Sequence, residues 1–186
     1  GTIAIEAAMI AADRAPGLSR TFGFQKLAWF DGPTWQRLKQ RARDRVKAPP
    51  PSPTLFASDR LSAAVQKTRQ NAANAGVDAF LAVEQADALE RRAPAPSGTL
   101  VANPPYGIRL EDKARVAQMY PRLGDALKAR YAGWSAWLFS GDTDLPKKIG
   151  LRAEKRIPLW NGAIECRLYA YRIVSGKLDE RRQAEA

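Results

Sequence analysis

The sequence predicts an α/β fold with a doubly wound, mostly parallel sheet. Short apolar runs of four to six residues alternate with longer segments in which apolar residues recur every three or four positions. The short runs have the length of buried strands, and the longer segments have the period of amphipathic helices. Near the end of the chain a long alternating segment, 163–174, follows an Asn-Gly turn signal, which predicts a C-terminal antiparallel hairpin.

The composition limits the kinds of chemistry that the chain can perform. A length of 186 residues with 45% hydrophobic residues fits one globular domain, which we place at 1–175, followed by a charged tail at 176–186. The chain has no histidine, which excludes Ser-His and Cys-His nucleophiles and His-bound metals. The single Cys166 can form neither an internal disulfide nor a thiolate metal cluster. We therefore expect no metal.

The charge of the chain predicts a polyanionic partner. Thirty Lys and Arg residues against 19 Asp and Glu residues give a net charge of +11, and contacts from such residues to phosphates release counterions. The alternative is a basic protein whose charges face only solvent. No apolar run approaches the roughly 20 residues of a membrane span, so we expect a soluble, cytoplasmic protein without membrane contact.

The chain opens at Gly1-Thr2 and runs directly into an alanine-rich helical pattern at 3–12. A glycine and a threonine at the start of a helix are typical of the end of the Gly-rich turn in nucleotide-binding α/β domains, where helix amides face the ligand. Gly1 and Thr2 are therefore candidate cofactor contacts. We expect the chain to be a fragment that lacks the first strand; the alternative is a natural N-terminus that begins with a helix.

The segment 17–53 is a long connection that is rich in aromatic and basic residues. Its predicted helix begins near Pro33 and places apolar side chains on one face. The rest of that helix is basic, which predicts either an RNA-facing surface or a solvated one. A stiff proline-rich spacer, 49–53, ends the segment. The aromatic residues are Phe22, Phe24, Trp29, Phe30 and Trp35; the apolar face is Trp35, Leu38, Ala42 and Val46; the basic residues are Arg37, Lys39, Arg41, Arg43, Arg45 and Lys47.

A carboxylate follows the next predicted strand. The run 54–58 reads as a strand, Asp59 stands at its carboxyl end, and a helix follows until Gly76. This is the position at which α/β nucleotide-binding domains hold ribose hydroxyls. The alternative role of Asp59 is that of a helix N-cap. A third short strand is predicted at 79–83.

The strand predicted at 99–102 ends in a polar, proline-rich loop. Proline removes backbone donors and fixes φ, so the chain must leave the sheet after Asn103. The Asn103 side-chain oxygen and the Pro104 carbonyl, held by Pro105, are two acceptors for an exocyclic amine, and Tyr106 offers a face for stacking. No general base is required, because positioning the nitrogen lone pair supplies most of the catalysis. The alternative is a simple strand exit.

The remaining elements complete the predicted sheet. A helical stripe of buried positions is expected around Pro121, which should kink or restart the helix. The predicted elements are a helix over 116–131, a buried strand at 134–139, a loop and short helix at 140–148, a strand at 151–157, a tight turn at Asn161-Gly162 and the long closing strand at 163–174.

Asn103-Pro104-Pro105-Tyr106 resembles the (Asn/Asp/Ser)-Pro-Pro-(Tyr/Phe) signature of S-adenosylmethionine-dependent methyltransferases that modify exocyclic amines of bases. Segments 6–18, 22–24 and 161–166 look more narrowly like the bacterial 23S ribosomal RNA guanine-N2 methyltransferases. This resemblance implies a Rossmann-like class I methyltransferase with strand order 3-2-1-4-5-7-6, of which strand 1 is missing here. It also implies an RNA-binding THUMP domain upstream.

The resemblance assigns a role to each candidate site residue. It implies methyl transfer from S-adenosylmethionine to the N2 amine of a guanine in large-subunit ribosomal RNA. Leu61 replaces an acid that the group often carries two positions after Asp59, so only one ribose contact is expected. We also expect the fragment by itself to bind the cofactor weakly or not at all, and to be inactive. The implied catalytic residues are Asn103, Pro104, Pro105 and Tyr106; Gly1, Thr2 and Asp59 would bind the cofactor, and Asp87 would accept from its adenine amine.

Three alternatives remain open at this point. The signature does not separate purine amines, so an adenine-N6 methyltransferase of DNA or RNA is the second hypothesis. A transfer RNA guanine-N2 methyltransferase would share the fold and the loop. A non-catalytic RNA-binding module could use the basic helix and the Trp-rich segment alone.

Overall fold

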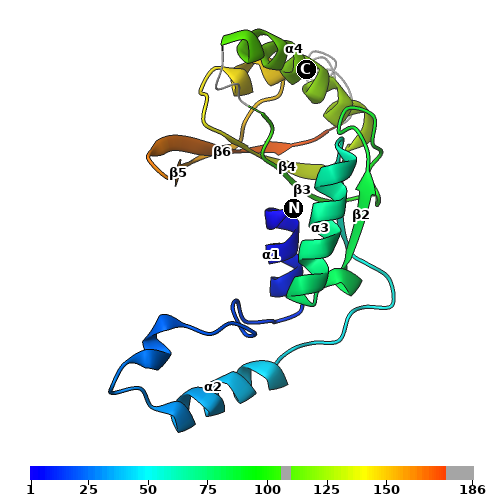
Figure 1. Ribbon diagram of the computed structural model, residues 1–186. Coiled ribbons are helices and arrows are strands. Elements are labelled where there is room, and N and C mark those ends of the chain that lie inside the picture. Colours follow the sequence, from blue (N-terminus) through cyan, green and yellow to red (C-terminus); the bar gives the residue numbers. More distant parts are fainter. Residues whose placement is uncertain (106–109, 175–186) are drawn as a thin grey trace. The chain divides into compact units, whose positions relative to one another are not determined.

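The computed structural model describes residues 1–105 and 110–174, and the chain divides into two compact units, Gly1–Ala86 and Asp87–Ala186. Each unit has its own sheet and its own core (Figure 1). The chain combines helices with strands, as the sequence predicts, although β3 follows β2 and β6 follows β5 without a helix between them.

The first unit contains a two-stranded parallel sheet. Leu55 lies opposite Leu81 at its beginning and Asp59 lies opposite Gln85 at its end. The elements of this unit are α1 (Thr2–Ala11), η1 (Gly23–Lys26), α2 (Gly32–Asp44), β1 (Leu55–Asp59), α3 (Ser62–Ala75), η2 (Asp78–Phe80) and β2 (Leu81–Gln85).

Small side chains allow α1 to pack closely in the core of the first unit. Ala8 and Ala12 are buried against Val77 and Phe80, and α1 lies beside α3 (Figure 1). The third strand begins two residues later than predicted, because residues 78–80 form a 3₁₀ turn in which the Phe80 amide donates to the Val77 carbonyl. The predicted end of α3 at Gly76 is confirmed, with φ of +67° at that glycine.

The helix α2 differs from an ordinary amphipathic helix. It begins where predicted, because the Asp31 carboxylate caps it by accepting from the Thr34 amide at 3.0 Å. None of its residues is buried, however, and Leu38 on the predicted apolar face is 49% exposed. Val46 lies beyond the end of the helix.

The second unit contains a four-stranded mixed sheet in the order β3-β4-β6-β5. β3 and β4 are parallel, while β6 is antiparallel to both β4 and β5, which confirms the closing hairpin. Together with the pair formed by β1 and β2, these neighbours match the expected strands 3-2 and 4-5-7-6. Among the described residues no strand precedes β1. The elements are β3 (Gly98–Ala102), α4 (Leu110–Arg130), β4 (Trp134–Ser140), η3 (Leu145–Ile149), β5 (Lys155–Asn161) and β6 (Ile164–Arg172).

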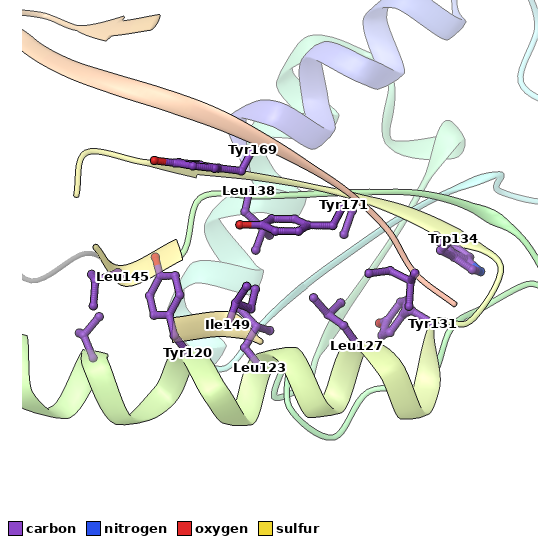
Figure 2. Close-up of a cluster of buried hydrophobic side chains, with 13 residues drawn as sticks. Tyr120, Leu123, Leu127, Tyr131, Trp134, Leu138, Leu145, Ile149, Tyr169 and Tyr171 are labelled. Atoms are coloured by element: carbon purple, nitrogen blue, oxygen red, sulfur yellow. The ribbon is translucent and has the colours of Figure 1, made fainter. Parts of the chain in front are cut away.

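One face of this sheet forms a core with α4 and η3. Tyr120, Leu123 and Leu127 of α4 point toward Leu138 and Tyr171 of the sheet (Figure 2). The stripe predicted along α4 is therefore confirmed. The restart predicted at Pro121 is wrong, since α4 continues through this residue. Pro121 is exposed, so water can reach the carbonyl that loses its donor there.

Three predictions about the strands need correction. β3 is buried on one face only, because Leu100 and Ala102 pack against the core while Val101 is 47% exposed. β5 begins at Lys155 rather than at 151 and includes Pro158, which an edge strand tolerates because its outer amides need no partner. The turn after β5 is centred on Gly162 and Ala163, since Asn161 still pairs with Ile164.

Candidate functional site

Asp59 ends β1 and shapes the turn into α3. Its Oδ1 accepts from the Leu61 amide at 2.8 Å, and its main-chain oxygen accepts from the Ala86 amide at 3.1 Å. Leu61, not Asp59, holds the N-cap position of α3 and is 60% exposed. The exposed Asp59 carboxylate keeps its Oδ2 without a hydrogen bond or ion pair among the described residues, so that oxygen is available to a ligand.

Gly1 and Thr2 form the beginning of α1. The C-terminal half of α1 packs near Leu55 and Val77, where the two strands begin. Its N-terminal end therefore points toward the carboxyl ends of the strands, the side on which Asp59 lies. Amides in the first turn of a helix have no intrahelical partner and favour negative or electron-rich groups. A Cβ on Gly1 would collide with the Thr68 side chain, so this position requires glycine.

Asp87 lies at the start of the second unit, two residues after β2. The half-buried side chain accepts from the Leu89 amide at 2.8 Å through Oδ1. The main-chain oxygen of Asp87 accepts from the amides of Glu90 and Arg91 at 3.0 and 2.9 Å. Asp87 thus folds a tight turn around itself, as Asp59 does, and its Oδ2 makes no hydrogen bond or ion pair with the described part of the chain.

Asn103 is the first residue after β3. Its side chain is exposed, Pro104 is buried and Pro105 is exposed. No peptide bond in the described segment is cis, so the two prolines continue the chain in the ordinary trans form. The Asn103 amide makes no hydrogen bond within the ranges 1–105 and 110–174, and a rigid proline residue follows it directly. Tyr106, the fourth candidate catalytic residue, lies outside the described residues.

The loop after β4 shares the carboxyl edge with Asn103, because β3 and β4 are parallel. The Ser140 hydroxyl, 2% exposed, donates to the Asp142 carbonyl at 2.9 Å and accepts from the Asp142 amide at 3.1 Å. The Asp142 carboxylate accepts from the amides of Asp144 and Leu145 at 2.7 and 3.0 Å. Sequence reasoning missed this network, although a Ser-Gly-Asp sequence after an apolar run is a recognisable turn signal.

The electrostatics of this edge are simple. The Lys147 ammonium, which donates to Asp144 at 2.7 Å, lowers the pKa of the Asp144 carboxyl.

No group of three or more His, Cys, Asp and Glu side chains in the described ranges could hold a metal ion. No helix in the same ranges has the length and apolar character that crossing a membrane demands.

The site residues therefore fall into two groups. Gly1, Thr2 and Asp59 lie on one edge of the first unit, and Asp87 and Asn103 belong to the second. Glycine at a helix start, exposed carboxylate oxygens and an exposed amide beside a buried proline are suited to binding a polar, uncharged or cationic ligand and an amine.

The model of the RMKL-like methyltransferase domain matches residues 1–170. The chain belongs to this family. Ribosomal RNA large subunit methyltransferase K/L of Syntrophotalea carbinolica is 40% identical over 93% of the chain and 25% of its own length. The protein of the same name in Shewanella baltica is 38% identical over 92% of the chain and 24% of its own length. The resemblance seen in the sequence is confirmed.

Solved structures agree with this RMKL-like methyltransferase assignment. A "possible methylase" from Clostridium difficile 630 has a TM-score of 0.86 and 32% identity, covering 95% of this chain and 46% of that one. The protein SMU.472, solved with SAH, has a TM-score of 0.84 and 30% identity, with the same two coverages. A "predicted N6-adenine-specific DNA methylase" from Listeria monocytogenes has a TM-score of 0.81 and 30% identity, covering 93% and 44%. The class I methyltransferase fold is confirmed.

The chain spans about a quarter of the length of the curated relatives that it matches and under half of the solved chains. The matched region runs through both compact units, from residue 1 to residue 170. The two units thus belong to one family domain.

Proposed function

We propose that the protein to which this chain belongs transfers a methyl group from S-adenosylmethionine to the N2 amine of a guanine in 23S ribosomal RNA. The observation that carries this proposal is the exposed Asn103 amide at the end of β3, followed by the buried Pro104, in a chain 40% identical to a ribosomal RNA large subunit methyltransferase. Guanine N2 as the acceptor comes from the resemblance of the Asn-Pro-Pro-Tyr loop and of the hairpin at 161–166 to that group.

The residues present fit S-adenosylmethionine. The free Oδ2 atoms of Asp59 and Asp87 are acceptors suited to ribose hydroxyls and to the adenine amine, respectively. The first-turn amides of α1, after Gly1 and at Thr2, are donors suited to the electron-rich end of the cofactor. SAH in the related SMU.472 structure supports this cofactor. When bound, S-adenosylmethionine supplies an electrophilic methyl group on a sulfonium.

The chain's own residues position the acceptor amine. The Asn103 side-chain oxygen and the Pro104 carbonyl would each accept one N–H of the guanine amine, which turns the nitrogen lone pair away from the ring. With the amine held in this way, its lone pair would be directed at the methyl group that bound S-adenosylmethionine would supply; S-adenosylhomocysteine would be the leaving group, and one amine proton would pass to water. Because both acceptors sit beside rigid proline residues, their geometry needs little reorganisation during the reaction.

An Asn103→Ala variant tests this mechanism. The full-length natural protein and its variant would be given labelled S-adenosylmethionine and unmodified 23S ribosomal RNA, followed by nucleoside analysis. We expect the wild type to form N2-methylguanosine and the variant to lose kcat by about a hundredfold or more, as for removal of a preorganised polar contact. Asn74→Ala, an exposed asparagine on α3, is the matched control and should keep the wild-type rate.

The product and the rates separate the remaining explanations. A wild-type rate in Asn103→Ala would refute the positioning role of this amide. N6-methyladenosine in place of N2-methylguanosine would favour the second candidate, adenine-N6 methylation, to which the name of the Listeria monocytogenes relative points. DNA in place of RNA as the better substrate would point the same way. The upstream THUMP domain remains a prediction from the resemblance, and a cytoplasmic location remains a prediction from the hydropathy of the sequence.

A further inference from the structure

Residues 17–47, here called the basic arm, form a small folded unit around aromatic rings. Trp35 makes edge contacts with Phe24 and Phe22, with ring centroids 5.1 and 5.9 Å apart, and Phe22 stacks on Phe24 at 5.5 Å. Phe30 packs on Phe24 at 5.9 Å. A Cβ on Gly17 would meet the Phe22 ring at 2.7 Å. These contacts fix η1 and the start of α2 with respect to each other.

The other end of the arm is attached to α1. The Arg45 guanidinium pairs with Asp13 at 2.8 Å, and the Lys47 amide donates to the Ala12 carbonyl at 2.8 Å. Ala42 near the end of α2 lines a pocket together with Met9 and Ile10 of α1. The arm therefore holds in a defined position a helix of which only the Trp35 end packs on the aromatic cluster and no residue is fully buried.

The arm exposes a large aromatic side chain that its own core does not use. Trp29, in the loop before α2, is 79% exposed, and Leu38 on α2 is 49% exposed. The four other aromatic residues of the arm contact one another. Trp29 lies outside this aromatic cluster, so its exposed ring is available to stack on the flat face of a ligand.

The arm also carries a large share of the positive charge. It has eight Lys and Arg residues against two Asp residues, a net charge of +6 out of +11 for the whole chain, in about one-sixth of its length. Arg37, Arg41 and Arg45 follow one another at intervals of four along one side of α2, and Lys39 and Arg43 do so along the other. Lys39, Arg41 and Arg43 have no acidic partner within 4 Å among the described residues.

We propose that the basic arm binds single-stranded RNA, with Arg37 and Arg41, on one side of α2, on phosphates and Trp29 stacked on an unpaired base. A groove or helix that combines unpaired positive charge with an exposed aromatic ring has the chemistry of single-strand recognition. A membrane surface is disfavoured, because Trp35 is used within the arm and α2 offers only Leu38 and Ala42 as further apolar residues. This inference rests on the proposed function, in that an RNA methyltransferase needs such a surface.

The test measures RNA affinity and its salt dependence in the full-length natural protein. The probe is a fluorescein-labelled single-stranded RNA oligonucleotide of mixed sequence. Arg37→Gln/Arg41→Gln should weaken binding at least about tenfold and lower the slope of log K against log salt by about 1.4, since each lost phosphate contact removes about 0.7. Trp29→Ala should weaken binding about tenfold with the slope unchanged, and Trp29→Phe should restore most of the affinity.

Matched controls make the same types of substitution at exposed residues outside the basic arm. Lys67→Gln/Arg122→Gln changes the net charge equally at exposed positions on α3 and α4, and Trp160→Ala removes a tryptophan that is 66% exposed on β5. Both should bind RNA like the wild type. In methyl-transfer assays the arm variants should raise KM for RNA more than they lower kcat.

The outcomes separate this inference from the proposed function. If the wild type methylates RNA while the arm variants keep its affinity and salt slope, the basic arm is not an RNA surface. If the wild type binds the probe through the arm but methylates no RNA, the inference holds and the proposed function fails. If the arm variants no longer bound anionic phospholipid vesicles but still bound RNA like the wild type, the inference would be overturned in favour of a membrane surface.

Discussion

Gly124 of α4 lies against the main-chain carbonyl oxygen of Ile149 in η3 so closely that no Cβ fits between them. Ile149 is fully buried, and it packs with Leu123 and Leu127 of the same helix (Figure 2). η3 follows the Ser140 to Asp142 loop, which shares the carboxyl edge of the sheet with Asn103. The contact therefore fixes the position of the segment that borders the proposed methylation site.

Gly124→Ala should destabilise the protein. A methyl group there forces α4 and η3 apart, and overpacking of this kind costs about 1–3 kcal/mol, which outweighs the gain of up to about 1 kcal/mol that alanine gives in a helix interior. Urea unfolding would measure the difference. Gly32→Ala in α2 is the control, since a Cβ there meets only the Phe30 ring at 3.8 Å. A gain in stability for Gly124→Ala would contradict the packing seen here.

Tyr171→Phe should flatten the loss of stability at alkaline pH. Burial raises the pKa of Tyr171, and its hydroxyl has no hydrogen-bond partner in the described part of the chain. The folded state thus keeps a proton above pH about 10, where a tyrosine in the unfolded chain loses it. The contribution is fully present below that pH and is lost above it, by up to about 1.4 kcal/mol per pH unit.

The check is urea unfolding between neutral and strongly alkaline pH. At neutral pH the variant should be about as stable as the wild type, because no hydrogen bond is removed. Burial also raises the pKa of Tyr120, so Tyr120→Phe should flatten the curve further in the double variant. Parallel curves for wild type and Tyr171→Phe would show that this hydroxyl ionises equally easily in both states.

The sequence was sufficient to predict the parts of the site that depend on local structure. Asn103 lies after β3 because Pro104 and Pro105 cannot continue a ladder, and Asp59 lies at the end of β1 because a short apolar run stops there. The helix ends at Gly76 for the equally local reason that glycine adopts positive φ.

Features that depend on distant neighbours could not be predicted in this way. Val101 is 47% exposed, whereas its apolar neighbours Leu100 and Ala102 pack against the core on the other face of the sheet; the apolar run alone cannot indicate which face is covered. β5 includes Pro158 because it is an edge strand, a property of the whole sheet. The contact of Gly124 with Ile149 joins residues 25 positions apart, and no periodicity reports it.

Asp59→Asn and Asp87→Asn should weaken cofactor binding without unfolding the turns. Asparagine keeps an oxygen for the amides of Leu61 and Leu89, which now donate to the two carboxylates at 2.8 Å. It replaces the free carboxylate oxygen by an amide NH2, which cannot accept. Loss of a charged hydrogen bond of about 1.5–3 kcal/mol raises Kd for S-adenosylmethionine by a factor of ten or more.

Calorimetry on the full-length natural protein would measure this Kd. Asp78→Asn, at an exposed residue in η2, is the matched control and should bind the cofactor like the wild type. Unchanged affinity of Asp59→Asn for S-adenosylmethionine would show that the Asp59 carboxylate does not bind the cofactor and serves only to form the turn.

Gly1 and Thr68 allow the position of α1 to be tested by a double-mutant cycle. Gly1→Ala places a methyl group against the Thr68 side chain, which pushes the first turn of α1 away from α3. Since the first-turn amides are proposed to face the cofactor, Gly1→Ala should raise its Kd and lower the free energy of unfolding. Thr68→Ala alone loses the hydrogen bond that its Oγ1 donates to the Ala64 carbonyl at 2.8 Å, which costs about 1 kcal/mol.

In the double variant the space left by Thr68 accommodates the new methyl group, so the two changes should be less than additive. Coupling of about 0.5–3 kcal/mol is typical of residues in direct contact. The same cycle, measured as Kd for S-adenosylmethionine, separates two causes of weaker binding. Thr68→Ala can restore affinity if Gly1→Ala displaces α1, but it cannot restore affinity if the new methyl group itself blocks the cofactor. Additive losses in stability would mean that α1 does not press on α3 at this point. Coupling in stability without recovery of affinity would mean that the methyl group on residue 1 itself obstructs the cofactor.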